Sequence, residues 1–201
     1  MLILKYIINS LTGFSCLLVL SLYFQKIAEA NIIGQCKTTP NQGKSYYVST
    51  TGHDYKGNGT RSNPWRTIEF AAFKAEELST IIVFPGEYNG AIRLKKAFNK
   101  SLLIKSEYPY LSKLSHDARI LAIVGGAKNI TIEGFEFTHT NDKAKPILVH
   151  IDGYGSYGTQ TVSDITLKNN IFHDSYNNDL LKINNGAIKM SLIKLLKNIK
   201  P

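Results

Sequence analysis

A cluster of polar and ionisable residues in the last third of this 201-residue chain has the residue types needed for chemistry. It consists of His150, Asp152, His173, Asp174, Asn177, Asn178, Asp179 and Lys182. The sequence has no GxSxG elbow, Walker loop, HExxH motif or CxxC pair, so the common motif-based activities have no support. What remains is acid–base chemistry at Lys182 and His150, with binding by carboxylates and amides.

Two repeats must position these residues. Residues 165–172 can be laid over residues 130–137 with an offset of 35 (165 minus 130), and residues 180–185 over residues 148–153 with an offset of 32. Residues 122–125 fit one repeat earlier. Strand, polar turn and strand recurring in this way are typical of a stacked solenoid rather than a folded-back sheet.

The alternation of side chains along a strand predicts which residues of the second repeat share a face. If the aliphatic residues of 148–153 face the core, His150 and Asp152 point outward. The alignment then places His150 next to Lys182, and Asp152 next to Asn184, at the roughly 4.8 Å spacing of paired strands. A charged His150 would depress the pKa of Lys182, which makes Lys182 a candidate base.

The asparagines of the repeat leave two interpretations open. Asn169, Asn170, Asn184 and Asn185 follow strands at turns, where asparagine tolerates left-handed backbone geometry and bonds its neighbours. This favours a structural ladder of stacked amides, and substrate binding is the alternative.

Composition and the chain start predict an exported, basic protein of one domain. The chain is 43% hydrophobic and 19% charged, with a formal net charge of +9. Residues 1–30 have the form of a secretory signal peptide: Lys5, an apolar core at 14–24, and a small-residue cleavage site at 28–30. An uncleaved membrane anchor is the alternative. The basic charge is compatible with polyanionic partners.

The remaining segments are expected to flank or cap a solenoid. We expect a linker at 31–45, a long turn-rich loop at 51–64, and a short amphipathic helix at 67–75 that covers the first coil. Residues 188–201 form a basic tail whose apolar residues fit a helical stripe. The alternative is a strand at 190–192 that continues the repeat.

Two parts of the sequence resemble a known family. Residues 46–72 (YYVSTTGHDYKGNGTRSNPWRTIEFAA) and 81–90 (IIVFPGEYNG) are similar to the start of bacterial right-handed parallel β-helix proteins of the pectate-lyase-like superfamily. The tandem NITIEGFEFTHT and DITLKNNIFHDSYNNDLLKINNGA are similar to their repeat. The resemblance implies an all-β fold, a right-handed parallel β-helix over residues 46–187. It is less specific for the reaction, because the scaffold also carries hydrolases, epimerases and adhesins.

The resemblance implies a secreted polysaccharide lyase that acts on an acidic, uronic polymer by calcium-assisted β-elimination, or a truncated remnant of one. Such a reaction needs a base and a cation that neutralises the developing charge. We assign Lys182 and His150 to catalysis. Substrate binding goes to His173, Asn177, Asn178 and Asn184, and calcium binding to Asp152, Asp174 and Asp179, since hard cations select oxygen donors.

The alternative function is that of a non-catalytic carbohydrate-binding or cell-surface β-helix. In either case we expect an acidic polysaccharide as partner and a monomeric protein. We expect no nucleic acid as partner, and no stable membrane association once the signal peptide is cleaved.

Overall fold

The computed structural model describes residues 43–141, 147–153, 160–175, 179–184, 186–191 and 194–196. These residues form three parallel sheets and one short helix. Sheet A contains β1 (Ser45–Val48), β2 (Thr80–Val83), β5 (Ala97–Ser106), β8 (Lys128–Glu133), β11 (Val162–Lys168) and β14 (Gly186–Ser191). Sheet B contains β3 (Gly86–Asn89), β6 (Ser112–His116), β9 (Glu136–His139), β12 (Ile171–His173) and β15 (Lys194–Leu196). Sheet C contains β4 (Ile92–Leu94), β7 (Leu121–Val124), β10 (Val149–Asp152) and β13 (Leu181–Asn184).

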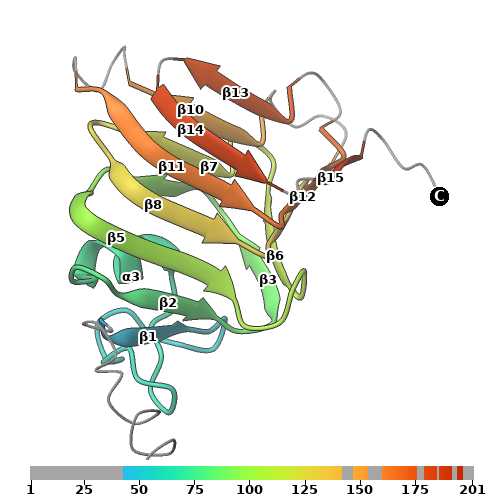
Figure 1. Ribbon diagram of the computed structural model, residues 1–201. Helices are drawn as coiled ribbons and strands as arrows, with labels where there is room; N and C mark the ends of the chain where they lie inside the picture. Colours follow the sequence, from blue (N-terminus) through green and yellow to red (C-terminus); the bar gives the residue numbers. More distant parts are fainter. Residues whose placement is uncertain are drawn as a thin grey trace, which may run out of the picture. The chain divides into compact units, whose positions relative to one another are not determined.

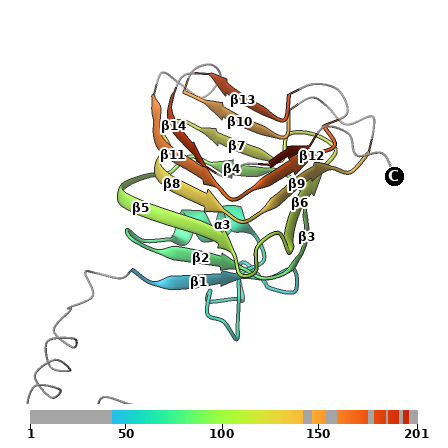
Figure 2. The same ribbon diagram turned by 45° about the vertical axis from the view of Figure 1, so that its right-hand side comes forward.

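The chain winds through the three sheets in turn, so neighbouring strands of one sheet are a whole coil apart in sequence. β8 of sheet A is followed by β9 of sheet B and β10 of sheet C, and β11 then returns to lie beside β8. Figures 1 and 2 show the strands of successive coils stacked above one another. The predicted right-handed parallel β-helix with a short N-terminal cap helix is confirmed.

Stacked apolar columns form the core, and their register confirms the repeat found in the sequence. Ile165 pairs with Ile130, and Phe172 with Phe137. The rings of Phe137 and Phe172 stack with centroids 4.7 Å apart and planes inclined by 13°, and both side chains are fully buried. The offset of 35 residues therefore corresponds to one coil.

Asn170 joins two coils through its side chain. It is fully buried; its Nδ2 donates to the carbonyl of Ile132 at 2.9 Å, and its Oδ1 accepts from the N–H of Phe135 at 2.9 Å. Asn169 has a left-handed backbone (φ 53°) and donates to Glu133 Oε1 at 3.1 Å. The structural interpretation holds for both residues, although the partners of Asn170 are main-chain groups rather than a stack of amides.

The predicted cap helix is α3 (Ile68–Lys74). Thr67 is its N-cap, because its Oγ1 accepts from the N–H of Phe70 at 3.2 Å. Ile68, Ala71 and Ala72 are buried, as expected for the apolar face. A hydrogen bond joins α3 to sheet C. Glu69 Oε2 of the helix accepts from the N–H of Arg93 in β4, the edge strand of that sheet, at 3.0 Å.

The predicted helix in the C-terminal tail is wrong where the tail is described. β14 pairs with β11, with Ile188 opposite Ile165 and Met190 opposite Leu167, and β15 pairs with β12. The exposed edge of a parallel sheet offers unpaired N–H and C=O groups, and a segment with alternating apolar residues can satisfy them. Strand pairing therefore prevails over a helical stripe present in the same residues.

The predicted signal peptide at 1–30 lies outside the described residues, as does most of the linker at 31–45. Within the described residues, the structure has no helix with the length and apolar character needed to cross a bilayer.

Candidate functional site

The outward face of sheet C carries one column of residues from four successive coils. Arg93 of β4 pairs with Ala122 of β7, Ala122 with His150 of β10, and His150 with Lys182 of β13. The next outward column brings Asp152 beside Asn184. The predicted pairing of His150 with Lys182 and of Asp152 with Asn184 is confirmed residue by residue.

His150 is buried although it points outward, with only 8% of its surface exposed. Its Nε2 lies 3.2 Å from Asn184 Nδ2 and 3.7 Å from Asp152 Oδ2. Its Nδ1 is buried and has no hydrogen-bond partner among the described residues. Nε2 thus faces the Asn184 amide and the Asp152 carboxylate, which gives His150 the position of a residue that supports its neighbours.

The pKa of His150 is lowered from its ordinary value, chiefly because burial penalises the charged ring. The positive charges of Arg119 and Lys182 act in the same direction, and the carboxylate of Asp152 opposes them. The ring is therefore neutral at neutral pH. An Asn184 amide that donates to Nε2 also requires a neutral ring. The assignment of Lys182 as a candidate base required a charged His150, and at neutral pH the ring is uncharged.

Lys182 is the exposed member of the pair, and Asn184 beside it is exposed as well. An amine on an exposed strand face can take a proton from a bound ligand or pair with a carboxylate. The amide of Asn184 is held by His150. Sheet C therefore presents a cation and an oriented amide to solvent, with a neutral imidazole behind them.

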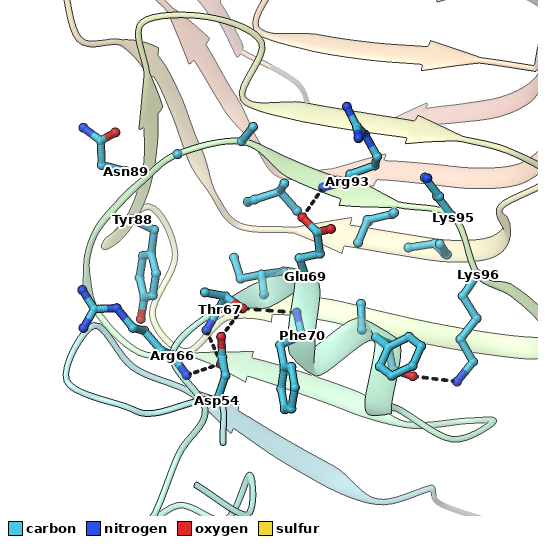
Figure 3. A pocket seen from close by; sticks show the side chains of 18 of the residues that line it. Asp54, Arg66, Thr67, Glu69, Phe70, Tyr88, Asn89, Arg93, Lys95 and Lys96 are labelled. Carbon is cyan, nitrogen blue, oxygen red and sulfur yellow. Dashed lines mark hydrogen bonds between the residues drawn. The ribbon is translucent and has the colours of Figure 1, made fainter. Parts of the chain in front are cut away.

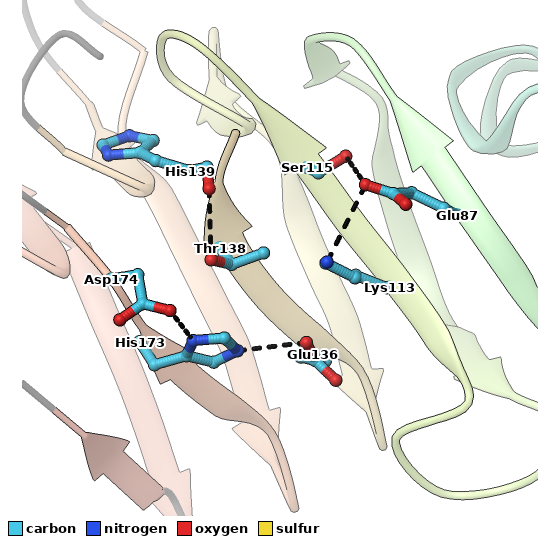
Figure 4. A network of polar contacts seen from close by, with 8 residues as sticks. All are labelled: Glu87, Lys113, Ser115, Glu136, Thr138, His139, His173 and Asp174. Atoms are coloured by element: carbon cyan, nitrogen blue, oxygen red, sulfur yellow. Dashed lines mark hydrogen bonds and ion pairs between the residues drawn. The ribbon is translucent and has the colours of Figure 1, made fainter. Parts of the chain in front are cut away.

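His173 and Asp174 belong to a different face, the outside of sheet B. His173 Nδ1 lies 2.5 Å from Asp174 Oδ2, and its Nε2 lies 3.0 Å from Glu136 Oε1 of the preceding coil. Figure 4 shows the imidazole between the two carboxylates. Both ring nitrogens are engaged, so the expected sugar contact of His173 would have to displace one of these carboxylates.

The three predicted calcium ligands are not brought together. Asp152 lies in sheet C near His150, Asp174 follows β12 of sheet B and contacts His173, and Asp179 is exposed before β13. The described residues contain no group of three or more His, Cys, Asp or Glu side chains that could hold a metal ion. These residues do not fit a calcium site. Asn177 and Asn178 lie outside the described residues.

Sequence reasoning missed two basic residues near the candidate site, Arg93 in β4 and Arg119 just before β7. Arg93 lies in the column of His150 and Lys182; its signal was the alternation Ile92-Arg93-Leu94, which lies 29 residues (121 minus 92) before the strand that starts at Leu121. Arg119 comes from the turn before β7, and its Nε is buried with no partner among the described residues. No periodicity marks a turn residue, so Arg119 had no comparable signal.

Comparisons with solved structures show which known proteins share this fold. The chain superposes on the PL6 family alginate lyase AlyGC with a TM-score of 0.52 and 17% identity, over 77% of this chain and 20% of that chain. An arginine mutant of the same enzyme gives 0.52 and 15% over the same shares. The chain shares the parallel β-helix fold of this lyase. The predicted resemblance is confirmed for the fold, which is all that identities this low can show.

The chain spans about one fifth of the length of the alginate lyase that it matches. Pectate lyase Pel9A superposes with a TM-score of 0.46 and 14% identity, over 75% of this chain and 47% of that chain. No protein-family profile matches the sequence, and no curated protein matches it.

Proposed function

We propose that this β-helix is an exported, polysaccharide lyase-like protein whose sheet C face binds an acidic polysaccharide. The observation that carries the proposal is the outward column from Arg93 to Lys182, which has exposed cations in its first and last coils. The two are three strand spacings apart, about 14 Å. A polymer with a carboxylate on each sugar can reach both cations at once, which a single small anion cannot do.

β-Elimination is the reaction that the exposed base would support. Lys182, as the uncharged amine, takes the proton on the carbon next to the sugar carboxylate. The electron pair of the broken C–H bond forms a carbon–carbon double bond, the bond to the glycosidic oxygen breaks, and that oxygen takes up a proton from water. In this scheme Asn184 orients the sugar, and His150 is a positioning residue that holds Asn184. No step of the scheme uses a metal ion.

Binding without catalysis is the second candidate. It is favoured by the exposure of Lys182, since a lysine on an open strand face can pair with a sugar carboxylate without taking part in any reaction. Both candidates need the same face of sheet C, so one experiment separates them.

The experiment incubates the purified protein with polygalacturonate and with alginate, and follows the ultraviolet absorbance of the unsaturated product. Each reaction is run with added calcium and with a chelator, which tests the calcium requirement expected from the sequence. Retention on the immobilised polymers measures binding. A lyase forms product; a binder is retained without product. If the protein forms no product and is not retained on any uronic polymer, the proposal is refuted.

Site variants locate the activity on the molecule. Lys182→Ala should abolish turnover and weaken retention, because it removes both the base and a cation of the column. Lys128→Ala is the matched control, since Lys128 is an exposed lysine at the start of β8 in sheet A. Equal losses in both variants would point to general charge attraction rather than to sheet C.

A further inference from the structure

A pocket lies at the capped end of the β-helix, between α3 and the edge strand β4. Its volume is about 860 Å³, within the range of roughly 300–1,000 Å³ typical of small-molecule sites. It exists because α3 takes the place of strands in the first coil: the helix contacts β4 through the Glu69 carboxylate and does not fill the space beneath that strand. Figure 3 shows the pocket opening between the two elements.

Much of the pocket lining is apolar. Ile68 and Ala72 come from α3, Leu94 from β4, and Phe98 from β5, and these four side chains are buried. Phe73 of α3 also lines the pocket and is 69% exposed. An exposed aromatic ring next to buried aliphatic groups favours a ligand with an apolar body.

Three polar side chains of the lining, those of Asp54, Glu69 and Tyr88, already have protein partners. Asp54 accepts from the N–H groups of Arg66 and Thr67 and from Thr67 Oγ1. Glu69 accepts from Arg93 N–H, and the Tyr88 hydroxyl donates to the carbonyl of Phe84 at 2.9 Å. These groups are therefore poorly placed to replace the water around a sugar's many hydroxyl groups.

Cations occupy two sides of the pocket. In Figure 3, Arg66 lies beside Tyr88 on one side, and Arg93, Lys95 and Lys96 lie on the other. The guanidinium of Arg66 has no partner among the described residues. Its donors match a carboxylate in shape and charge, so it is the best placed anchor for an anion.

We propose that this pocket binds a small amphipathic carboxylate, with its apolar body against Phe73 and the aliphatic floor and its carboxylate at Arg66. The site shares Arg93 with the polysaccharide face and differs from it in chemistry, because it selects an apolar body where sheet C selects repeated charge. Its failure would leave the proposed function standing, and the reverse also holds.

The chain carries its own reporter for this site. Trp65 is the single tryptophan of the sequence, and its indole packs against the ring of Phe70, with centroids 5.6 Å apart and planes at 76°. Phe70 lines the pocket. A ligand that moves Phe70 therefore changes the surroundings of the only indole.

The test titrates the whole protein with three probes, using Trp65 fluorescence and calorimetry. 3-Phenylpropionate has both required features, 3-phenylpropan-1-ol lacks the charge, and galacturonate lacks the apolar body. We expect 3-phenylpropionate to bind at least about 5-fold more tightly than either of the others. Equal binding of the alcohol, tighter binding of galacturonate, or no binding of 3-phenylpropionate would overturn the proposal.

Variants place the probe within the pocket. Ala91→Phe narrows the mouth, and Ala97→Phe is the control, an exposed alanine that does not line the pocket. Arg66→Gln should weaken 3-phenylpropionate roughly 2- to 5-fold and leave the alcohol unchanged, whereas Lys56→Gln in the same loop should change neither. Unchanged affinity in both Ala91→Phe and Arg66→Gln would overturn the assignment even if the wild-type protein binds the probe.

Discussion

Replacing Asn170 by alanine should destabilise the β-helix more than its small change in volume suggests. The side chain is fully buried and makes two hydrogen bonds of 2.9 Å, to the N–H of Phe135 and the carbonyl of Ile132. The substitution would leave both main-chain groups buried without that partner, at a cost of about 1–3 kcal/mol each. Together this is about 2–6 kcal/mol.

Thermal and urea unfolding followed by circular dichroism measure this loss. At about 2–4 °C per kcal/mol for a chain of this size, a central loss of about 4 kcal/mol lowers the melting temperature by roughly 8–16 °C. Asn169→Gly is the neighbouring control, since Asn169 is half-buried, its side chain bonds the Glu133 side chain, and glycine tolerates the left-handed backbone at this position. A loss below about 1 kcal/mol in Asn170→Ala would refute the reasoning, because water or rearranged backbone would then satisfy both groups.

Three further predictions concern the core, the cap and the sheet C face. Phe172→Ala should cost about 3–5 kcal/mol of unfolding free energy, because the ring is fully buried and stacked on Phe137; urea unfolding measures it, and a cost near that of a surface mutation would contradict the stacking. Thr67→Ala should cost about 1 kcal/mol through loss of the helix cap, and thermal unfolding against Thr67→Ser, which retains the hydroxyl, checks the cause. Burial lowers the pKa of His150, so the unfolded chain binds the extra proton first as pH falls through about 6.5. Stability should therefore drop between about pH 7.5 and pH 5 by more in the wild type than in His150→Gln; an equal drop would show that other groups cause it.

Strand register could be predicted from the sequence because the two repeats align without gaps in their apolar positions. The pairing of Ile165 with Ile130 and of His150 with Lys182 follows from that alignment and from the two-residue alternation of a strand. The tail was ambiguous for a physical reason: Ile188 and Met190 fit the alternation, while the wider spacing of apolar residues also fits a helix. Only the open edge of β11 decides between them.

The chemistry of the site was less predictable, because it depends on contacts between segments that no periodicity relates. Arg119 affects the pKa of His150 from a turn, so the neutral state of the ring could not be inferred from its strand neighbours. The engagement of His173 by Glu136 and Asp174 likewise depends on side-chain orientation across two coils. Residue types alone identified the candidate residues. The structure was needed to show which of them lie on the outer face of sheet B and which lie on the outer face of sheet C.

The hydrogen bond from Arg93 N–H to Glu69 has a consequence for self-association. β4 is the edge strand of sheet C, and an incoming strand would need that N–H group to begin pairing. The Glu69 carboxylate occupies it and adds negative charge where a second chain would dock. This contact should disfavour the growth of aggregates by strand addition at this edge, and Glu69→Ala should increase the tendency of the folded protein to form fibrils.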